Sequence, residues 1–216
     1  MDDESTGKPA AKTIEETHDL NAIHDGRDSA GEMNVEDAVR EILIQIGEDP
    51  DRRGLIKTPS RISSMYRELT SGYRIEPGEL INDAIFEEEY DEMVIVRDIE
   101  YYSLCEHHLL PFFGKCHVAY VPNGKIIGLS KIPRIVEMFS MRLQVQERMT
   151  KQIAVLLNDA LNPKGVAVVV EGYHLCVAMR GVKKAEANML TSSMKGVFKK
   201  DERTRMEFLS LIKKPL

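Results

Sequence analysis

The chain carries a dense run of metal-ligand residue types at Cys105-Glu106-His107-His108, directly after a segment that predicts a β-strand. A cysteine and a histidine three residues apart on a turn can bind one metal ion, and zinc prefers this mixture of thiolate and imidazole. The alternative is a buried thiol beside two ordinary histidines. The run by itself indicates a zinc site without establishing one.

A second cluster of the same chemistry lies at His174-Leu175-Cys176. It falls within VAVVVEGYHLCVAM, residues 166–179, which is rich in β-branched residues and predicts a buried strand. Because alternate residues of a strand face the same side, His174, Cys176 and Arg180 should project together. Packing alone does not require these side chains on one face, so the pattern indicates a functional face.

Combining the two clusters predicts three zinc ligands: Cys105, His108 and Cys176. Three protein ligands leave the fourth tetrahedral position to water, which is the arrangement of catalytic zinc. His107 and His174 would then be free to transfer protons. A competing interpretation adds Cys116 as a fourth ligand and makes the site structural. The apolar neighbours Val118 and Tyr120 favour a packed thiol at that position instead.

Phosphate could bind where residues 128–134 pass from a strand into a helix. Ser130 is a candidate N-cap, and the free N–H groups, the helix dipole, Lys131 and Arg134 all favour an anion there. Arg180 could join them from the metal-facing strand. The alternative is a capped helix with solvated basic side chains.

Glu147 lies at the start of another predicted helix. Its carboxylate either complements the helix dipole or accepts two N–H groups from a guanine edge, and composition does not decide between these roles.

Signatures of metalloproteases and cytidine deaminases are absent from the sequence, and so are the P-loop and the Rossmann glycine motif.

Hydrophobic periodicity and turn residues predict an α+β domain with a largely antiparallel sheet. Asn123-Gly124 predicts a tight hairpin between residues 115–121 and 125–130. A loop is expected from Ser71 to about Glu88. Uncovered strand edges would favour an oligomer formed through the sheet. The expected helices cover residues 34–46, 58–66, 132–142, 145–162 and 201–211, and the expected strands cover 91–103, 115–121, 125–130 and 166–179.

Charge is distributed unevenly along the 216 residues, which contain 29 Lys and Arg against 35 Asp and Glu, a formal charge of −6. Residues 1–32 hold nine of the acidic and three of the basic side chains, so they carry the whole excess. This tail contains few apolar residues and is expected to be disordered. The body, residues 33–216, is formally neutral, which argues against nucleic acid as a partner.

Composition also bears on the compartment. No run approaches the ~20 consecutive apolar residues of a membrane span, so we expect no membrane segment. Three cysteines cannot all pair within one chain, and the opening MDDESTGKPA has no feature of a secretion signal. These observations favour a reducing cytoplasm.

Four long segments, taken in order, closely resemble the GTP cyclohydrolase I family. The resemblance extends from about residue 34 to the C-terminus and includes KTPSRISSMY and RMEFL. It implies a catalytic domain over 33–216, with N-terminal helices in about 34–70 and a core in about 90–216. The four segments are SLCEHHLLPFFGKCHVAYVP, IGLSKIPRIVEMF, LQVQERMTKQIA and GYHLCVAMRGV.

The resemblance implies a specific reaction. In that reaction, water activated by zinc would attack C8 of the guanine of GTP, formate would leave, and the ribose would rearrange to give 7,8-dihydroneopterin triphosphate, the first step of folate or tetrahydrobiopterin synthesis. His107 and His174 would handle protons, and Glu147 would bind guanine. The zinc ligands of the family match Cys105, His108 and Cys176, and its triphosphate contacts match Ser130, Lys131, Arg134 and Arg180, with Arg61 from a neighbouring subunit.

The family fold is the tunnelling fold, in which sheets from five subunits close a barrel and two pentamers form a homodecamer with active sites between subunits. A regulatory protein partner and feedback control are compatible with this resemblance, and the acidic tail is one candidate for a regulatory role. Three positions depart from the family pattern: Pro133, Met141 and Gly172. The non-enzymatic alternative is an oligomeric, zinc-stabilised module that binds a nucleotide as a signal.

Overall fold

The computed structural model describes residues 33–81 and 84–213, so the expected disorder of residues 1–32 lies outside the described part of the chain. The described body forms one compact unit that begins at Val35. Its elements are α1 Val35–Gln45, α2 Thr58–Leu69, the 3₁₀ helix η2 Ser71–Arg74, α3 Pro77–Ile81, β1 Ile85–Glu87, β2 Val94–Cys105, β3 Pro111–Val121, β4 Lys125–Ile127, α4 Lys131–Ser140, β5 Leu143–Gln144, α5 Gln146–Leu161, β6 Gly165–His174, α6 Leu175–Ala178, β7 Asn188–Gly196, α7 Val197–Lys200 and α8 Glu202–Lys213.

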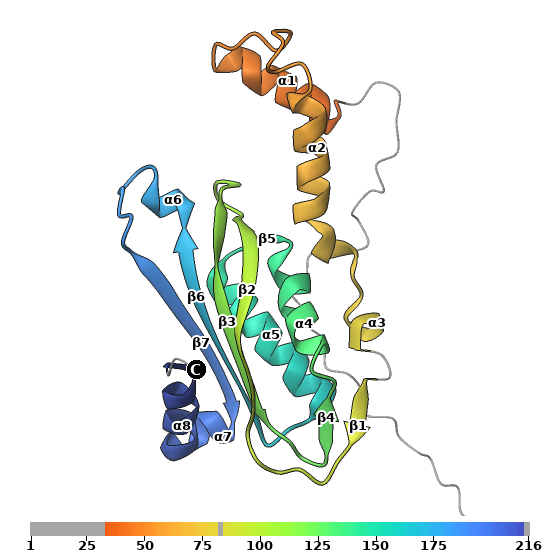
Figure 1. Cartoon of the computed structure of the whole chain (residues 1–216), viewed down its shortest axis with the longest axis vertical. Coiled ribbons are helices and arrows are strands. Elements are labelled where there is room, and N and C mark those ends of the chain that lie inside the picture. Colours follow the sequence, from red (N-terminus) through yellow and green to blue (C-terminus); the bar gives the residue numbers. More distant parts are fainter. Residues whose placement is uncertain (1–32, 82–83, 214–216) are drawn as a thin grey trace, which may run out of the picture. The chain divides into compact units, whose positions relative to one another are not determined.

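A five-stranded sheet in the order β5-β2-β3-β6-β7 forms the centre of the fold (Figure 1). Neighbouring strands are antiparallel except for the short parallel pair of β2 and β5, which confirms the α+β class and the largely antiparallel sheet. The hairpin predicted at Asn123-Gly124 is wrong. β4 leaves the main sheet and pairs with β1, because β3 already has β2 on one side and β6 on the other.

Helices α4 and α5 cover one face of the sheet (Figure 1). Their apolar side chains pack against the valines of β6, and each fully buried side chain of this kind contributes about 1.5 to 3 kcal/mol. A smaller core on the opposite face joins α7 and α8 to the sheet through Phe198 and Phe208. The main contacts of the larger core are Ile132, Ile135, Met149, Ile153, Leu157, Val166, Val168 and Val170, all nearly or fully buried.

The helices predicted near residues 34, 58, 132, 145 and 201 are confirmed. Three other expectations are corrected. The predicted loop from Ser71 to Glu88 contains η2, α3 and β1. The strand predicted through residue 179 ends at His174, and Leu175–Ala178 form a helical turn. β7 was not among the predicted strands. In the described residues, no helix is long and apolar enough to cross a membrane.

Candidate metal centre

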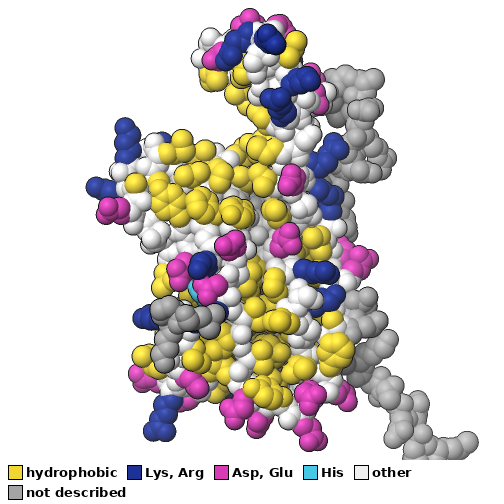
Figure 2. Space-filling model, in the orientation of Figure 1, with side chains coloured by type: hydrophobic (Ala, Val, Ile, Leu, Met, Phe, Trp, Pro, Cys, Tyr) yellow, Lys and Arg dark blue, Asp and Glu magenta, His cyan; other side chains and the backbone are white. Residues whose placement is uncertain are grey.

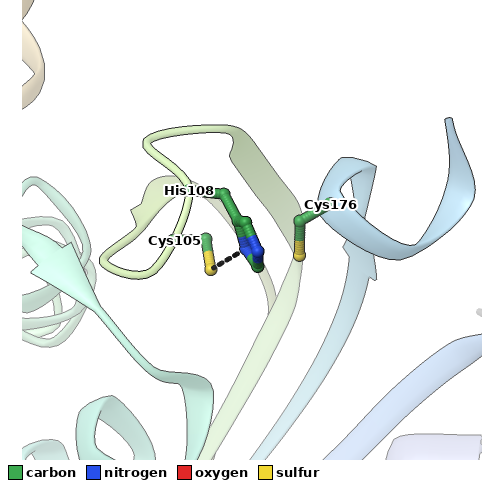
Figure 3. Close-up of side chains that lie close together, drawn as sticks. All are labelled: Cys105, His108 and Cys176. Carbon is green, nitrogen blue, oxygen red and sulfur yellow. Dashed lines mark hydrogen bonds between the residues drawn. The ribbon is translucent and has the colours of Figure 1, made fainter. Parts of the chain in front are cut away.

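Three side chains converge at the end of the sheet where β2 turns into β3 and β6 meets α6 (Figure 3). Sγ of Cys105, a ring nitrogen of His108 and Sγ of Cys176 all lie within 4.8 Å of one another. Cys105 Sγ is 3.8 Å from Nδ1 of His108. A tetrahedral zinc ion places such donor atoms about 3.3 to 3.8 Å apart, so the group needs only a small contraction to hold one.

A tight turn after β2 positions two of these ligands. The Leu109 N–H donates to the Cys105 carbonyl at 2.8 Å, and the Cys105 N–H donates to Leu110 at 2.9 Å. Leu109 has a left-handed φ of 54°, so the chain reverses within a few residues and His108 folds back toward Cys105.

Cys176 reaches the site by a different route from the one that the sequence predicted. Alternation along a strand was expected to align His174, Cys176 and Arg180, but β6 ends at His174 and Cys176 lies in the helical turn α6. Burial first, and then the neighbouring Cys105 thiol, raise the pKa of Cys176, while the positive charge of Arg180 lowers it. Arg180 therefore lies near the metal-ligand group.

The donor set fits zinc. Two thiols and one imidazole are the soft and borderline ligands that zinc selects, and three of them leave one tetrahedral position open. Cys116 is not part of the group. Its side chain is fully buried in the larger core, where burial raises the pKa of the thiol. The interpretation with four protein ligands is therefore wrong.

His174 is held from two sides next to this group. Its ring stacks on Phe112 with centroids 4.5 Å apart and planes 5° apart. Its Nε2 lies 2.8 Å from Oε1 of Gln146. Burial lowers the pKa of His174, and the nearby Glu147 carboxylate opposes this effect.

Gln146 is a site residue that the sequence did not reveal. It is buried, and its amide nitrogen donates to the carbonyls of Val170 and Met189 and to the Thr191 hydroxyl. These contacts direct Oε1 toward His174. A glutamine in the first turn of a helix has no distinctive pattern, so only the pairing of α5 with β6 and β7 discloses its role.

His107 projects outward, with 64% of its side chain exposed. Its Nδ1 lies 4.0 Å from Cys105 Sγ, and its Nε2 lies 3.8 Å from Glu106. Glu106 in turn forms a 2.6 Å ion pair with Arg148. The turn thus keeps His107 beside the ligand group while leaving it open to solvent.

Glu147 lies exposed in the first turn of α5, one residue after Gln146. Within the described residues its carboxylate has no hydrogen-bond or ion-pair partner in the protein. A carboxylate near His174 with free acceptor capacity can bind a ligand that presents paired N–H groups.

The residues predicted to bind phosphate are only partly brought together. Ser130 occupies the N-cap position of α4, but its side chain forms no cap hydrogen bond. Lys131 donates to the Leu80 carbonyl at 2.8 Å. α4 spans ten residues, so its start lies about 15 Å from the end that leads into β5 beside the ligand group. Ser130 and Lys131 therefore lie at the end of α4 that is away from the metal ligands of their own chain, and Arg134 lies about one turn further along.

Arg61 is exposed in α2, and among the described residues its guanidinium has no carboxylate partner. The structure of one chain thus places Arg180 close to the metal-ligand group and leaves four expected phosphate contacts elsewhere: Arg61, Ser130, Lys131 and Arg134.

The structure shows the surroundings of the three positions that the sequence resemblance singles out, Pro133, Met141 and Gly172. A Cβ at Gly172 would lie 2.0 Å from Oε1 of Gln146 and 2.8 Å from the Tyr101 hydroxyl, so glycine is required there. Pro133 lies in the first turn of α4, where a missing N–H costs little. Met141 uses its backbone carbonyl to accept the Gly72 N–H, a contact independent of side-chain type.

Comparison with known proteins identifies the family of this chain. A sequence model of GTP cyclohydrolase I matches residues 35–213. A GTP cyclohydrolase 1 from Leptospira biflexa is 59% identical over 83% of this chain and 98% of its own length. One from Campylobacter jejuni is 59% identical over 84% and 95%, and one from Synechococcus is 61% identical over 82% and 78%.

Among solved structures, archaeosine synthase QueF-Like in its apo form aligns with a TM-score of 0.40 and 18% identity over 48% of this chain and 93% of that one, a likeness too distant to add to the assignment. The family model extends across almost the entire described body and includes both segments that supply the two converging cysteines and the one histidine. The chain belongs to the GTP cyclohydrolase I family.

Proposed function

We propose that the chain converts GTP to 7,8-dihydroneopterin triphosphate and formate, with zinc held by Cys105, His108 and Cys176. Membership of the family makes the chain an enzyme that acts on GTP in pterin synthesis, so the non-enzymatic module is set aside. The observation that carries the zinc assignment is the convergence of two thiols and one imidazole within 4.8 Å. When bound, zinc supplies Lewis-acid chemistry that makes water a nucleophile near neutral pH.

His174 is suited to accept a proton at one atom. The amide nitrogen of Gln146 already donates to carbonyl and hydroxyl acceptors, so the amide oxygen Oε1 is the atom that faces His174. Because Oε1 can only accept a hydrogen bond, Nε2 of His174 is the donor. Neutral His174 therefore has Nδ1 unprotonated and able to accept. The lowered pKa keeps the ring neutral at physiological pH.

His107 would complete the proton transfers from the solvent side. Its exposure allows exchange with water as the guanine ring opens and formate leaves. Glu147 would orient the substrate, since a carboxylate accepts the two adjacent N–H groups of guanine and does not match the adenine edge.

The remote phosphate contacts support an active site shared between chains. Ser130 and Lys131 lie at the end of α4 that is away from the ligand group of their own chain, and Arg61 lies on a separate helix. We therefore place these residues in the site of a neighbouring subunit and expect an isolated monomer to be inactive.

Two surface features support assembly through the sheet. In the part of the chain that the structure describes, β7 ends the sheet and pairs only with β6. A row of aromatic rings, Tyr102, Phe113 and Tyr173, crosses β2, β3 and β6, and Tyr102 is 58% exposed. Figure 2 shows hydrophobic side chains gathered over this end of the sheet. Both features favour a homo-oligomer, and the decamer of the family is the assembly we propose.

A reducing compartment such as the cytoplasm suits this enzyme, because all three cysteines are free thiols and two of them are needed as metal ligands. In an oxidising compartment, disulfide formation would remove the two thiols that the metal needs as ligands.

The test measures formate release from GTP by the purified protein, before and after zinc removal, together with metal analysis. We expect zinc-dependent release at about one metal per chain. His107→Ala and His174→Ala should keep zinc and assembly but lose turnover by roughly 10²-fold or more. An active metal-free protein would contradict the zinc assignment, and a fully active double variant would contradict the proton-transfer roles.

A further inference from the structure

The segment that carries α1 and α2 contacts the C-terminal end of α4 at η2. We call this segment, residues 35–74, the arm. The Gly72 N–H in η2 donates to the Met141 carbonyl at 2.9 Å. A Cβ at Gly72 would lie 2.1 Å from the Met138 carbonyl oxygen, so the backbone of η2 lies directly against the last turn of α4.

The buried side chain of Arg142 connects the two sides of this contact. Arg142 is only 6% exposed. Its Nη2 donates to the Gly72 carbonyl of the arm at 2.7 Å, and its Nε donates to the Met138 carbonyl of α4 at 2.9 Å. Met138 is in the last turn of α4, where carbonyls have no partner within the helix. One planar guanidinium therefore bonds to the arm and to the end of α4 at the same time.

Two aromatic rings pack around the same guanidinium. The guanidinium carbon of Arg142 lies 5.5 Å from the centroid of the Tyr73 ring and 5.1 Å from that of the Phe139 ring, and aromatic faces attract a positive charge. Tyr73 belongs to the arm and Phe139 to α4. The Leu143 N–H in β5 donates to the Tyr73 hydroxyl at 3.1 Å. Carbonyls and rings from both sides thus hold Arg142 in one orientation.

We propose that Arg142 is a positioning residue, which sets the direction of α2 so that Arg61 reaches the GTP bound by a neighbouring chain. This inference rests on the proposed function, in which Arg61 contacts the triphosphate. Arg61 lies in the first turn of α2, and the eight residues from Arg61 to Leu69 span about 12 Å. A tilt of about 10° at η2 would therefore move Arg61 by about 2 Å. Displacements of this size are enough to remove a directed contact with the substrate.

The alternative is a role for Arg142 in the stability of its own chain alone. β5 follows Arg142 directly, and its Gln144 pairs with Cys105 of the metal-ligand group. If Arg142 only supported β5 and the end of α4, its loss would affect turnover whether or not Arg61 is present. The positioning role differs, because it requires the effect of Arg142 on substrate binding to depend on Arg61.

The test is a double-mutant cycle on the zinc-loaded, full-length protein in its assembled form, isolated by size-exclusion chromatography. KM and kcat for formate release from GTP are measured for Arg142→Met, Arg61→Ala and the double variant, together with zinc content and Tm. Arg74→Met is the matched control. Arg74 in η2 also donates to a carbonyl, that of Arg67 at 2.7 Å, but both residues belong to the arm.

Tyr73→Phe is a second and milder variant of the same contact. It removes the hydroxyl that accepts the Leu143 N–H but keeps the ring that packs on Arg142. This variant tests the proposal even if Arg142→Met fails to fold. It is measured alone and together with Arg61→Ala.

We expect Arg142→Met to raise KM for GTP roughly tenfold with zinc content unchanged, and Arg61→Ala to raise it by a similar factor. The double variant should have the KM of Arg61→Ala alone, because a misdirected Arg61 has no contact left to lose. Tyr73→Phe should raise KM about threefold in the wild type and leave it unchanged in Arg61→Ala. Arg74→Met should keep the KM of the wild type.

Three results would overturn the inference. Effects on KM that multiply in the double variants would show that Arg142 and Tyr73 act independently of Arg61. A raised KM in Arg61→Ala with wild-type values in Arg142→Met and Tyr73→Phe would reject the positioning role and leave the proposed function intact. A wild-type KM in Arg61→Ala would instead remove Arg61 from the proposed function, and the inference would fail with it.

Discussion

Gln146 and His174 are joined by a 2.8 Å contact between Oε1 and Nε2 that fixes which nitrogen of the imidazole carries the proton. The amide nitrogen of Gln146 has three acceptors around it, so the amide cannot turn over without losing them. Gln146 thus acts through His174 as a positioning residue.

Replacing Gln146 with Met should lower kcat roughly 10- to 100-fold while zinc content stays unchanged, because His174 loses the contact that sets its tautomer. Steady-state kinetics and metal analysis check this outcome. Thr191→Val is the matched control, since it removes a contact of the Gln146 nitrogen but leaves the one to His174. It should lower the Tm with kcat near that of the wild type. Equal losses of kcat in both variants would show that Gln146 acts only on stability.

Gly172→Ala should be damaging even though it adds a single methyl group. The new Cβ would overlap Oε1 of Gln146 and crowd the Tyr101 hydroxyl, so either β6 or α5 must shift. We expect a lower Tm and a reduced kcat in the same variant. Gly78→Ala is the control, because a Cβ at that position meets nothing within 4 Å. A Gly172→Ala enzyme with normal turnover would show that His174 tolerates movement of its partner.

The three cysteines should separate into two classes when each is replaced by Ala. Cys105→Ala and Cys176→Ala should lose zinc and activity, because each removes one of three converging donors. Cys116→Ala should keep zinc but destabilise the fold by about 2 kcal/mol, since it leaves a small cavity in the core. Metal analysis and thermal melts distinguish these outcomes. Zinc loss in Cys116→Ala would reopen the interpretation with four ligands.

Removing zinc under oxidising conditions should join Cys105 to Cys176. Their sulfur atoms already lie within 4.8 Å, so a modest approach permits a bond, and no third thiol is near enough to compete. After unfolding, the oxidised apoprotein should show one reactive thiol, that of Cys116, in place of three. It should take up zinc only after reduction. Oxidised apoprotein that shows three reactive thiols but still takes up no zinc would contradict this prediction.

The sequence predicted the metal ligands for a sound reason but placed one of them on the wrong element. Cys105, His108 and Cys176 follow from residue type, since few other roles need both thiols and imidazoles together. The strand prediction failed at Cys176, because Leu175–Ala178 form a helical turn and no glycine or proline at that point indicates the end of the strand. Gln146 was missed because its role depends on contacts with β6 and β7, which its residue type and position in the sequence do not reveal.

Elements with an apolar stripe were predicted well, and those without one were not. α5 buries Met149, Ile153 and Leu157 on one face, a periodicity that is visible in the sequence. β7 has the sequence NMLTSSMKG with little apolar alternation, because among the described strands it pairs only with β6 and it is half exposed. The Asn123-Gly124 signal was real as a turn but did not indicate which strand β4 would join.

The edge of β7, which has no strand partner among residues 33–81 and 84–213, also has a kinetic consequence for the newly made chain. A row of free N–H and C=O groups accepts any extended backbone, whether it belongs to a properly folded copy or to a partly unfolded one. In the assembly that we propose, correct association and aggregation compete for the same edge, and the competition depends on how quickly folded copies meet. Slow synthesis at low temperature should favour the assembled protein, whereas rapid overproduction should favour inclusion bodies.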